Sequence, residues 1–167
     1  QKKPHPHGVG GGYIDNGTFT EDGRILITWQ DPAHPPRLIT LDRSSDEEPE
    51  TVLAAGDAPG GRPWESVAYT SESGDFIQAW LAISEGEGSF AIFFHIHGGP
   101  THVMSGYFSP DSQSWLDHGF AFFSINYHGS TTFCKEFEKY IMGKIGKLEV
   151  VDMTAGCQWL VENEIAQ

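Results

Sequence analysis

Short apolar runs separated by polar turns occupy the first third of the chain. Residues 24–29 alternate apolar and polar side chains directly after the turn sequence Glu-Asp-Gly, and two further apolar runs lie at 37–42 and 51–54. Alternation with a period of two is typical of half-buried strands. This segment therefore predicts a small antiparallel sheet, interrupted by the proline-rich stretch 31–36 and preceded by a loop at residues 1–12.

The pattern changes beyond residue 63. Residues 64–70 and 76–84 predict two strands of a hairpin, joined by the turn sequence Ser-Glu-Ser-Gly-Asp. Residues 89–97 and 119–128 are nearly continuous apolar runs, rich in Phe and Ile. Strands that are apolar on both faces are typical of a central parallel sheet covered by helices, so we expect the α/β class with a mostly parallel core.

A helix is predicted between these two apolar runs, at residues 109–119. Ser109 is a suitable N-cap, Pro110 suits the first helical position, and Gly119 suits the end of the helix. Strand, helix and strand in this order predict a right-handed βαβ crossover and a parallel pairing of the two strands.

Two more helices are predicted at residues 135–146 and 147–164. In the second, apolar or small side chains recur at spacings of three and four residues, which predicts one buried face. This face consists of Val150, Met153, Thr154, Cys157, Leu160 and Val161. Trp115 and Trp159 fall on apolar helix faces, and we expect both in the core.

The stretch Gly-Asp-Ala-Pro-Gly-Gly-Arg-Pro at 56–63 is the best candidate for a domain boundary. We therefore expect two parts, an antiparallel segment at 1–62 and an α/β segment at 63–167. A sheet as small as the first does not bury both of its faces alone, so we expect it to pack on parts of a longer protein.

Composition and charge narrow the partners. The formal net charge is −13, and a chain this acidic repels phosphate backbones, which argues against nucleic acid. No apolar run approaches about 20 residues, so no membrane span is expected. Cys134 and Cys157 form neither a disulfide framework nor a zinc motif, which favours reduced thiols and a cytoplasmic location. The N-terminus lacks an initiator Met and a signal peptide, so we expect the chain to begin inside a longer protein.

The sequence His-Ile-His-Gly-Gly-Pro-Thr-His, at 95–102, is the most unusual stretch. His95 and His97 are two apart on a predicted strand and share a face, as two metal ligands would. The binuclear hydrolase pattern H-x-H-x-D-H fails, however, because Gly99 and Pro100 stand where Asp and His are required. We therefore expect no metal here and interpret His95 as a packed, hydrogen-bonded core residue.

The two glycines of this stretch suggest a different chemistry. In open α/β sheets, ligands bind where loops leave the carboxyl ends of the strands, and Gly98 and Gly99 follow a strand directly. Paired glycines allow a sharp turn with exposed N–H groups, which are the donors that an oxyanion hole requires.

Together with a second motif, this loop resembles a known family. The sequence His-Gly-Gly-Pro is followed about 27 residues later by Asn-Tyr-His-Gly-Ser-Thr at 126–131 and then by Gly-Lys-Ile-Gly-Lys-Leu-Glu-Val-Val-Asp-Met at 143–153. This order resembles the serine peptidases of the prolyl oligopeptidase family, in the branch with acylaminoacyl and dipeptidyl-peptidase-like enzymes. The resemblance covers residues 65–163 well. Residues 13–55 more loosely resemble the last blade of the β-propeller that those enzymes carry.

The resemblance implies an α/β-hydrolase fold and assigns roles within the loop. The backbone N–H of Gly99 is expected to be one oxyanion donor, in a turn that Gly98 makes possible. His97 stands where some relatives place a donor tyrosine, and its ring is a further candidate. Asn126 and Tyr127 are expected chiefly to brace neighbouring loops, and substrate contact by Asn126, Tyr127 and His128 is the alternative.

The chain also departs from the family pattern. His128 replaces the usual arginine, which substitutes a titratable ring for a permanent planar donor. Thr132 and Cys134 replace glycines, which suggests a more restricted backbone path in this loop. Glu149 and Asp152 match an acidic pair of the family, for which we expect a capping or loop-anchoring role.

The family's nucleophile lies in a G-x-S-x-G turn, and none of the 20 glycines here is followed two positions later by serine. We therefore expect part of a hydrolase domain without the Ser-Asp-His triad, inactive alone and completed by the rest of a parent chain. The parent is expected to cleave short peptides through an acyl-enzyme, without metal or organic cofactor. Alternatives are an esterase on the same fold and a non-catalytic binding module.

Overall fold

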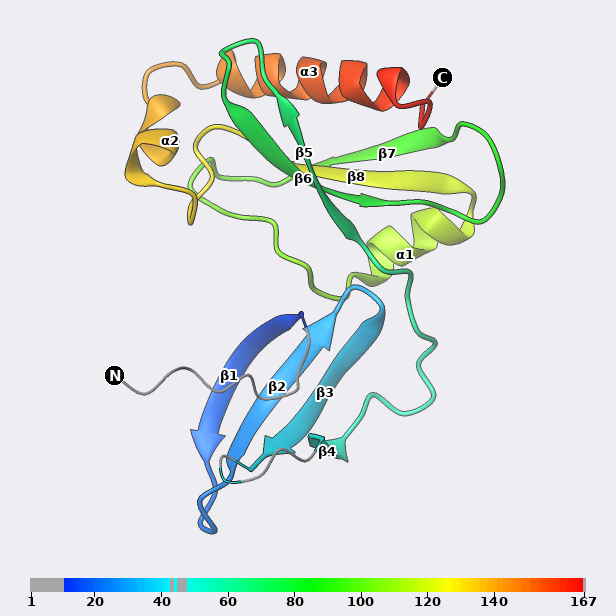
Figure 1. Ribbon diagram of the computed structural model, residues 1–167, viewed down its shortest axis with the longest axis vertical. Coiled ribbons are helices and arrows are strands. Elements are labelled where there is room, and N and C mark those ends of the chain that lie inside the picture. Colours follow the sequence, from blue (N-terminus) through cyan, green and yellow to red (C-terminus); the bar gives the residue numbers. More distant parts are fainter. Residues whose placement is uncertain (1–10, 43, 45–47, 167) are drawn as a thin grey trace. The chain divides into compact units, whose positions relative to one another are not determined.

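The computed structural model describes residues 11–42, 44 and 48–166, which form two compact units (Figure 1). One unit comprises the described residues up to Pro63 together with Gly106–Ser109, and the other comprises Trp64–Ser105 and the described residues from Pro110 onward. Most of the loop predicted at 1–12 lies outside the described residues. The interpretation of the first unit as the end of a propeller stays a prediction.

The first unit is an antiparallel sheet of four strands in sequential order. The strands are β1 (Tyr13–Phe19), β2 (Ile25–Asp31), β3 (His34–Leu41) and β4 (Glu50–Leu53). Ile27, Trp29, Ile39 and Leu41 are buried and form its small core. β1 was not predicted, and its residues are exposed along the whole strand.

The predicted proline-rich break between β2 and β3 is shorter than expected. β3 already begins at His34, so that Pro35 and Pro36 lie within the strand. The pairing of β2 with β3 is irregular between Trp29 and Asp31, opposite this segment. An irregular ladder at the start of a strand tolerates residues that lack a backbone donor.

The second unit is built on a mixed sheet in the order β5-β6-β8-β7. Its strands are β5 (Glu65–Thr70), β6 (Phe76–Ala82), β7 (Ala91–Ile96) and β8 (Phe120–Asn126). β5 pairs with β6, and β6 with β8, in antiparallel fashion, whereas β7 and β8 are parallel. The predicted hairpin and the predicted parallel pair are confirmed. The expectation of a mostly parallel core is wrong for the described strands, because one of their three pairings is parallel.

Helices cover both faces of this sheet (Figure 1). α1 (Pro110–Asp117) forms the predicted crossover between β7 and β8, and α3 (Leu148–Glu162) lies on the opposite face. The short helix α2 (Lys135–Tyr140) precedes α3 and ends earlier than the pattern predicted. The core under α3 includes Phe123 and Ile125 of β8, both inaccessible to solvent. Among the described helices, none is long and apolar enough to cross a membrane.

The buried face of α3 differs from the predicted one. Val150 and Val161 are more than half exposed, and Thr154 and Cys157 are also exposed. The face that packs on the sheet instead consists of Asp152, Ala155, Gly156 and Leu160, with Met153 and Trp159 half-buried beside it. A carboxylate and a glycine carry no hydrophobic signal, so periodicity alone selected the wrong face.

The two helix tryptophans have different environments. Trp159 packs against the core from a half-buried position, with its ring stacked on Tyr69 and Phe123. Trp115 is 39% exposed, so the prediction that it lies in the core is wrong. Its ring stacks on Phe93 of β7 at a centroid distance of 4.6 Å, and this contact takes the place of full burial.

Gly156 packs tightly against side chains of the sheet, and a methyl group there is expected to destabilise the protein. A Cβ on Gly156 would lie 2.9 Å from the Tyr69 hydroxyl and 3.2 Å from the Phe123 ring. We expect Gly156→Ala to lower the free energy of unfolding by about 1–2 kcal/mol, because overpacking exceeds the gain in helix propensity. The control is Thr154→Ala on the exposed face of α3, expected to stay within about 0.5 kcal/mol. Thermal unfolding of both variants tests this, and a Gly156→Ala protein as stable as wild type would contradict it.

Candidate functional site

The Gly98–Gly99 turn leaves the carboxyl end of β7 with its backbone open to solvent. Both glycines are exposed, and a Cβ on either would meet no atom within 4 Å. Gly99 has φ +57°, a left-handed conformation that glycine adopts without strain. Among the described residues, no group accepts a hydrogen bond from the Gly99 N–H. The turn therefore presents an unused backbone donor at the edge of the sheet where ligands bind in α/β proteins.

Asn126, the last residue of β8, holds the far end of this loop through Met104. The Met104 N–H donates to Asn126 Oδ1 at 2.7 Å, and Asn126 Nδ2 donates to the Met104 carbonyl at 3.0 Å. The same carbonyl accepts from Trp80 Nε1 at 2.8 Å, and Asn126 Nδ2 also donates to Gln78. Asn126 is buried, and its side-chain amide pairs with both the N–H and the carbonyl of Met104. A residue on a neighbouring strand would hold the Met104 backbone with the same two kinds of hydrogen bond.

The residues after Asn126 hold the near end of the loop. The Tyr127 hydroxyl donates to the His97 carbonyl at 2.9 Å, and the two rings stack with centroids 4.5 Å apart. Further along, the Thr131 N–H donates to the His102 carbonyl at 3.0 Å. The segment 126–131 thus fixes the loop on both sides of the glycine turn, and we call it the clamp.

The His97 ring is also tied to the clamp, and its partner defines its tautomer. The Ser130 hydroxyl donates to the Tyr127 carbonyl at 2.7 Å, so its oxygen accepts from His97 Nε2 at 3.0 Å. The neutral ring therefore carries its proton on Nε2. Nδ1 is buried and has no hydrogen-bond partner among the described residues.

Burial lowers the pKa of His97. Nearby His102 and His95 act in the same direction, whereas the Gly98 backbone opposes the shift. In this tautomer, the Nε2 proton of the buried His97 ring is directed to Ser130. The role of His97 as a side-chain donor stays a prediction, and this tautomer favours the Gly99 backbone instead.

His128 lies inside the clamp, between two carboxylates. Its backbone N–H and its ring Nδ1 both approach Asp152 Oδ2, at 2.9 Å and 2.8 Å, and ring Nε2 approaches Asp75 Oδ2 at 3.1 Å. Both His128 and Asp152 are buried, whereas the Asp75 side chain is 56% exposed. Asp152 also accepts a hydrogen bond of 2.6 Å from the Ser71 hydroxyl.

The structure places the predicted residues in one continuous region. Asn126, Tyr127 and His128 are buried and make contacts within the chain, in line with the expected bracing role; their contact with a substrate stays a prediction. Glu149 accepts from the Gly146 N–H at 2.8 Å, in the loop before α3, and Asp152 accepts from the His128 N–H of the clamp. Of the two expected roles, capping or loop anchoring, the structure thus confirms loop anchoring.

Sequence reasoning missed three contributors to this region. Ser130 belongs to the motif at 126–131, and its hydroxyl is the hydrogen-bond partner of the buried His97 ring. The sequence around Asp75 indicates only a turn, although Asp75 contacts the His128 ring. Met104 acts through its backbone, which no side-chain pattern reveals.

The histidines of this region are not arranged as metal ligands. His95 Nδ1 lies 2.9 Å from the Ser124 hydroxyl on the paired strand β8, which confirms that it is hydrogen-bonded, in a half-buried position. Burial lowers the pKa of His95 as well. Within the described residues, no three His, Cys, Asp or Glu side chains are grouped to hold a metal ion.

The two residues that replace family glycines behave differently. Thr132 has φ +76°, so it keeps the left-handed backbone that a glycine would adopt freely. Cys134 has an extended backbone and serves as the N-cap of α2, accepting from the Phe137 N–H at 3.4 Å. The first replacement therefore strains the backbone, whereas the second does not.

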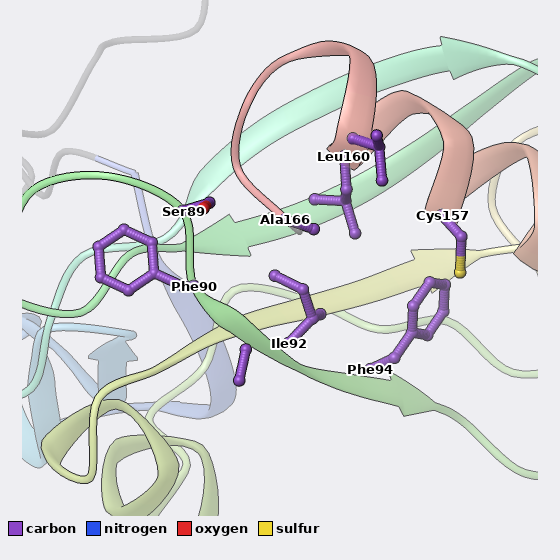
Figure 2. Close-up of a pocket in the computed structure, with 9 residues that line it drawn as sticks. Ser89, Phe90, Ile92, Phe94, Cys157, Leu160 and Ala166 are labelled. Atoms are coloured by element: carbon purple, nitrogen blue, oxygen red, sulfur yellow. The ribbon is translucent and has the colours of Figure 1, made fainter.

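A groove of about 530 Å³ lies between β7 and the C-terminal half of α3. Figure 2 shows Phe90, Ile92 and Phe94 on one wall, and Cys157 and Leu160 of α3 on the other. At one end of the groove, Phe90 and Ala166 form a parallel bridge, and the Phe90 N–H donates to the Ile165 carbonyl at 2.8 Å.

Comparisons with known proteins confirm the family resemblance. A sequence model described as the prolyl oligopeptidase family matches residues 107–167. An uncharacterized peptidase of Bacillus subtilis (strain 168), YuxL, is 32% identical over 93 residues. That match covers 53% of this chain and 14% of the relative.

Solved structures show the same fold. The acylaminoacyl peptidase of Pyrococcus horikoshii superposes with a TM-score of 0.80 at 17% identity, over 95% of this chain and 26% of that one. A puromycin-hydrolyzing peptidase of Mycobacterium tuberculosis gives a TM-score of 0.73 at 21% identity, over 86% of this chain and 23% of that one. The chain therefore spans about a quarter of these proteins.

The strain at Thr132 leads to a test of the loop. We expect Thr132→Gly to raise the free energy of unfolding by about 1 kcal/mol, because relief of the left-handed strain exceeds the added chain entropy. The matched control is Thr131→Gly, since Thr131 lies outside the left-handed region. The control is expected to lose about 0.5–1 kcal/mol. Chemical denaturation distinguishes the two, and a loss of stability in both would show that Thr132 is not strained.

Proposed function

We propose that the chain is part of a serine peptidase that hydrolyses short peptides through an acyl-enzyme. In such a reaction, a serine hydroxyl attacks the peptide carbonyl, a histidine takes the serine proton and passes it to the leaving amine, and water then releases the acyl group. We assign to this chain the backbone donor that stabilises the charged carbonyl oxygen. The proposed triad belongs to parts of the protein outside these 167 residues.

The observation that carries the proposal is the exposed N–H of Gly99 in a turn that is otherwise held firmly. An oxyanion donor is effective when it already points to the position where charge develops, because no reorganisation is then needed. The hydrogen bonds to His97, His102 and Met104 supply that rigidity on both sides of the turn. The peptidase names of YuxL and of the solved relatives support the proposed reaction class.

We further propose that a strand after Ala166 lies along the free side of β7 and brings the nucleophile beside Gly99. The parallel bridge between Phe90 and Ala166 gives this strand its direction, and the groove in Figure 2 has apolar walls to receive it. A parallel strand in that place would end at the same edge of the sheet as β7. Its following turn would therefore come close to the Gly98–Gly99 turn.

Fluorophosphonate labelling tests the activity itself. We expect the full-length natural protein that contains this chain to be labelled at a serine, and the 167-residue polypeptide to remain unlabelled. Turnover of acylated peptides compared with simple esters then separates a peptidase from an esterase. A full-length protein that is neither labelled nor active would leave only a binding role and would refute the proposal.

Substitution of Gly99 tests the assigned donor. The Gly99→Ala variant adds a methyl group in open space but strains the left-handed backbone, which moves the N–H. In the full-length enzyme, we expect kcat to fall about 10²-fold with a much smaller change in KM, as for the loss of an oxyanion donor.

The matched control is Gly143→Ala. Gly143 has φ +75° and equally open space, so this variant carries the same strain outside the loop. Its kcat should stay at the wild-type value. If Gly99→Ala changed kcat and KM by equal factors, or if the two variants behaved alike, the role of Gly99 would be rejected.

A further inference from the structure

His128 is enclosed by acceptors on both sides of its ring. Nδ1 lies 2.8 Å from Asp152 and Nε2 lies 3.1 Å from Asp75, and both partner atoms are carboxylate oxygens. A neutral imidazole has one N–H and one lone pair, so it satisfies one of these contacts and turns a lone pair toward the other carboxylate. The doubly protonated ring donates to both. The observed geometry is thus complete only when the ring carries both protons.

The two carboxylates anchor His128 to different parts of the unit. Asp152 belongs to α3 and is held by the Ser71 hydroxyl, while the Tyr69 hydroxyl donates to its backbone carbonyl at 2.8 Å. Asp75 belongs to the turn between β5 and β6, where the Ser71 N–H donates to the Asp75 carbonyl at 2.9 Å. The bridge through His128 therefore ties α3, the β5–β6 turn and the end of β8 together.

The other groups around the ring are aromatic. Phe137 of α2 stacks on the His128 ring with centroids 4.6 Å apart, and Tyr140 lies at 5.0 Å. The Lys144 ammonium lies over the Tyr140 ring, 3.7 Å from the ring centroid. Burial raises the pKa of Tyr69, and the Asp152 charge adds to this shift, so that the phenol stays a donor. Asp152 and Asp75 are thus the groups that hydrogen-bond the ring.

His128 is also the middle of the clamp. Its neighbours Tyr127 and Ser130 hold His97, and Thr131 holds His102, on the two sides of the glycine turn. The Gly129 N–H donates to the Phe137 carbonyl at 3.1 Å, and a Cβ on Gly129 would lie 2.8 Å from Ile141. The clamp backbone has little freedom to adjust, so movement at His128 is passed to its neighbours.

We propose that His128 is a positioning residue: its doubly protonated ring bridges Asp152 and Asp75 and so holds the clamp that fixes the Gly98–Gly99 turn. The proposal rests on the proposed function for its catalytic consequence. It replaces the permanent charge of the family's arginine by one that depends on pH. When the ring loses a proton, one of the two bridges is lost and the loop is released from that side.

The first experiment follows the wild-type protein and needs no activity. Histidine ring nitrogens of the intact protein are observed by NMR from about pH 5 to 8, the range in which histidine titrates, together with the Met104 amide. We expect the Met104 signal to change with the same midpoint as the His128 ring. A Met104 signal that stays constant while His128 titrates would overturn the proposal, as would a change that follows His95 or His97 alone.

Two variants sharpen this result. His128→Arg supplies a permanent charge with donors on several sides, so the pH step at Met104 should disappear. Asp75→Asn removes the charge of only the more exposed partner, so a smaller step should remain. A step of unchanged size in His128→Arg would refute the proposal, even if the variant were less stable than wild type.

Kinetics then connect the bridge to the reaction. In the full-length enzyme, we expect His128→Gln to lower kcat by up to about 10²-fold with a small effect on KM, because misplacement of a catalytic donor slows the chemical step. His128→Arg should restore most of the loss. If the full-length protein shows no hydrolase activity, the proposed function is refuted. The pH-dependent change of the Met104 signal still tests whether His128 bridges Asp152 and Asp75. Normal kcat in His128→Gln would refute the positioning role alone.

Discussion

The arrangement of α3, β5 and β8 in the second unit depends on the hydrogen bonds of one buried carboxylate, that of Asp152. A buried charge is tolerated only when hydrogen bonds replace the lost water, and Asp152 receives them from Ser71 and from the backbone and ring of His128. These donors come from the end of β5 and the end of β8, so one side chain of α3 joins three elements. Because Asp152 must face these donors, α3 is oriented so that Val150 and Val161 lie on its exposed side.

This arrangement explains why the glycine turn is open while its surroundings are not. The polar side chains of Asn126, Tyr127, His128 and Ser130 all have partners within the chain. Gly98 and Gly99 are the part of the loop that these bonds leave out. A rigid frame around one free N–H is what the proposed charge stabilisation demands, because a preorganised donor needs no rearrangement.

The local elements were predictable because their signals lie within a few residues. The β5–β6 hairpin follows from alternation around one turn, and α1 follows from Ser109, Pro110 and Gly119. The glycine turn and the bracing by Asn126 and Tyr127 followed from short motifs together with a family resemblance. The buried face of α3 was not predictable from periodicity, because its polar and small residues are buried by distant partners. Asp152 is held by Ser71, 81 positions away, and Gly156 packs against the Tyr69 ring, which also lies far away in the sequence.

The partners of His128 show the same limit more sharply, and also why the replacement of arginine matters. Asp75 lies 53 positions away in a turn whose sequence indicates only a turn, so no local pattern assigns it to His128. An arginine keeps its charge wherever carboxylates are ionised, whereas a histidine needs a second proton before it can donate to two carboxylates. Under the proposed bridge, the departure from the family pattern therefore changes the group that the two carboxylates hold. Whatever chemistry the Gly99 donor serves, its support is built around a ring whose two nitrogens both face carboxylates.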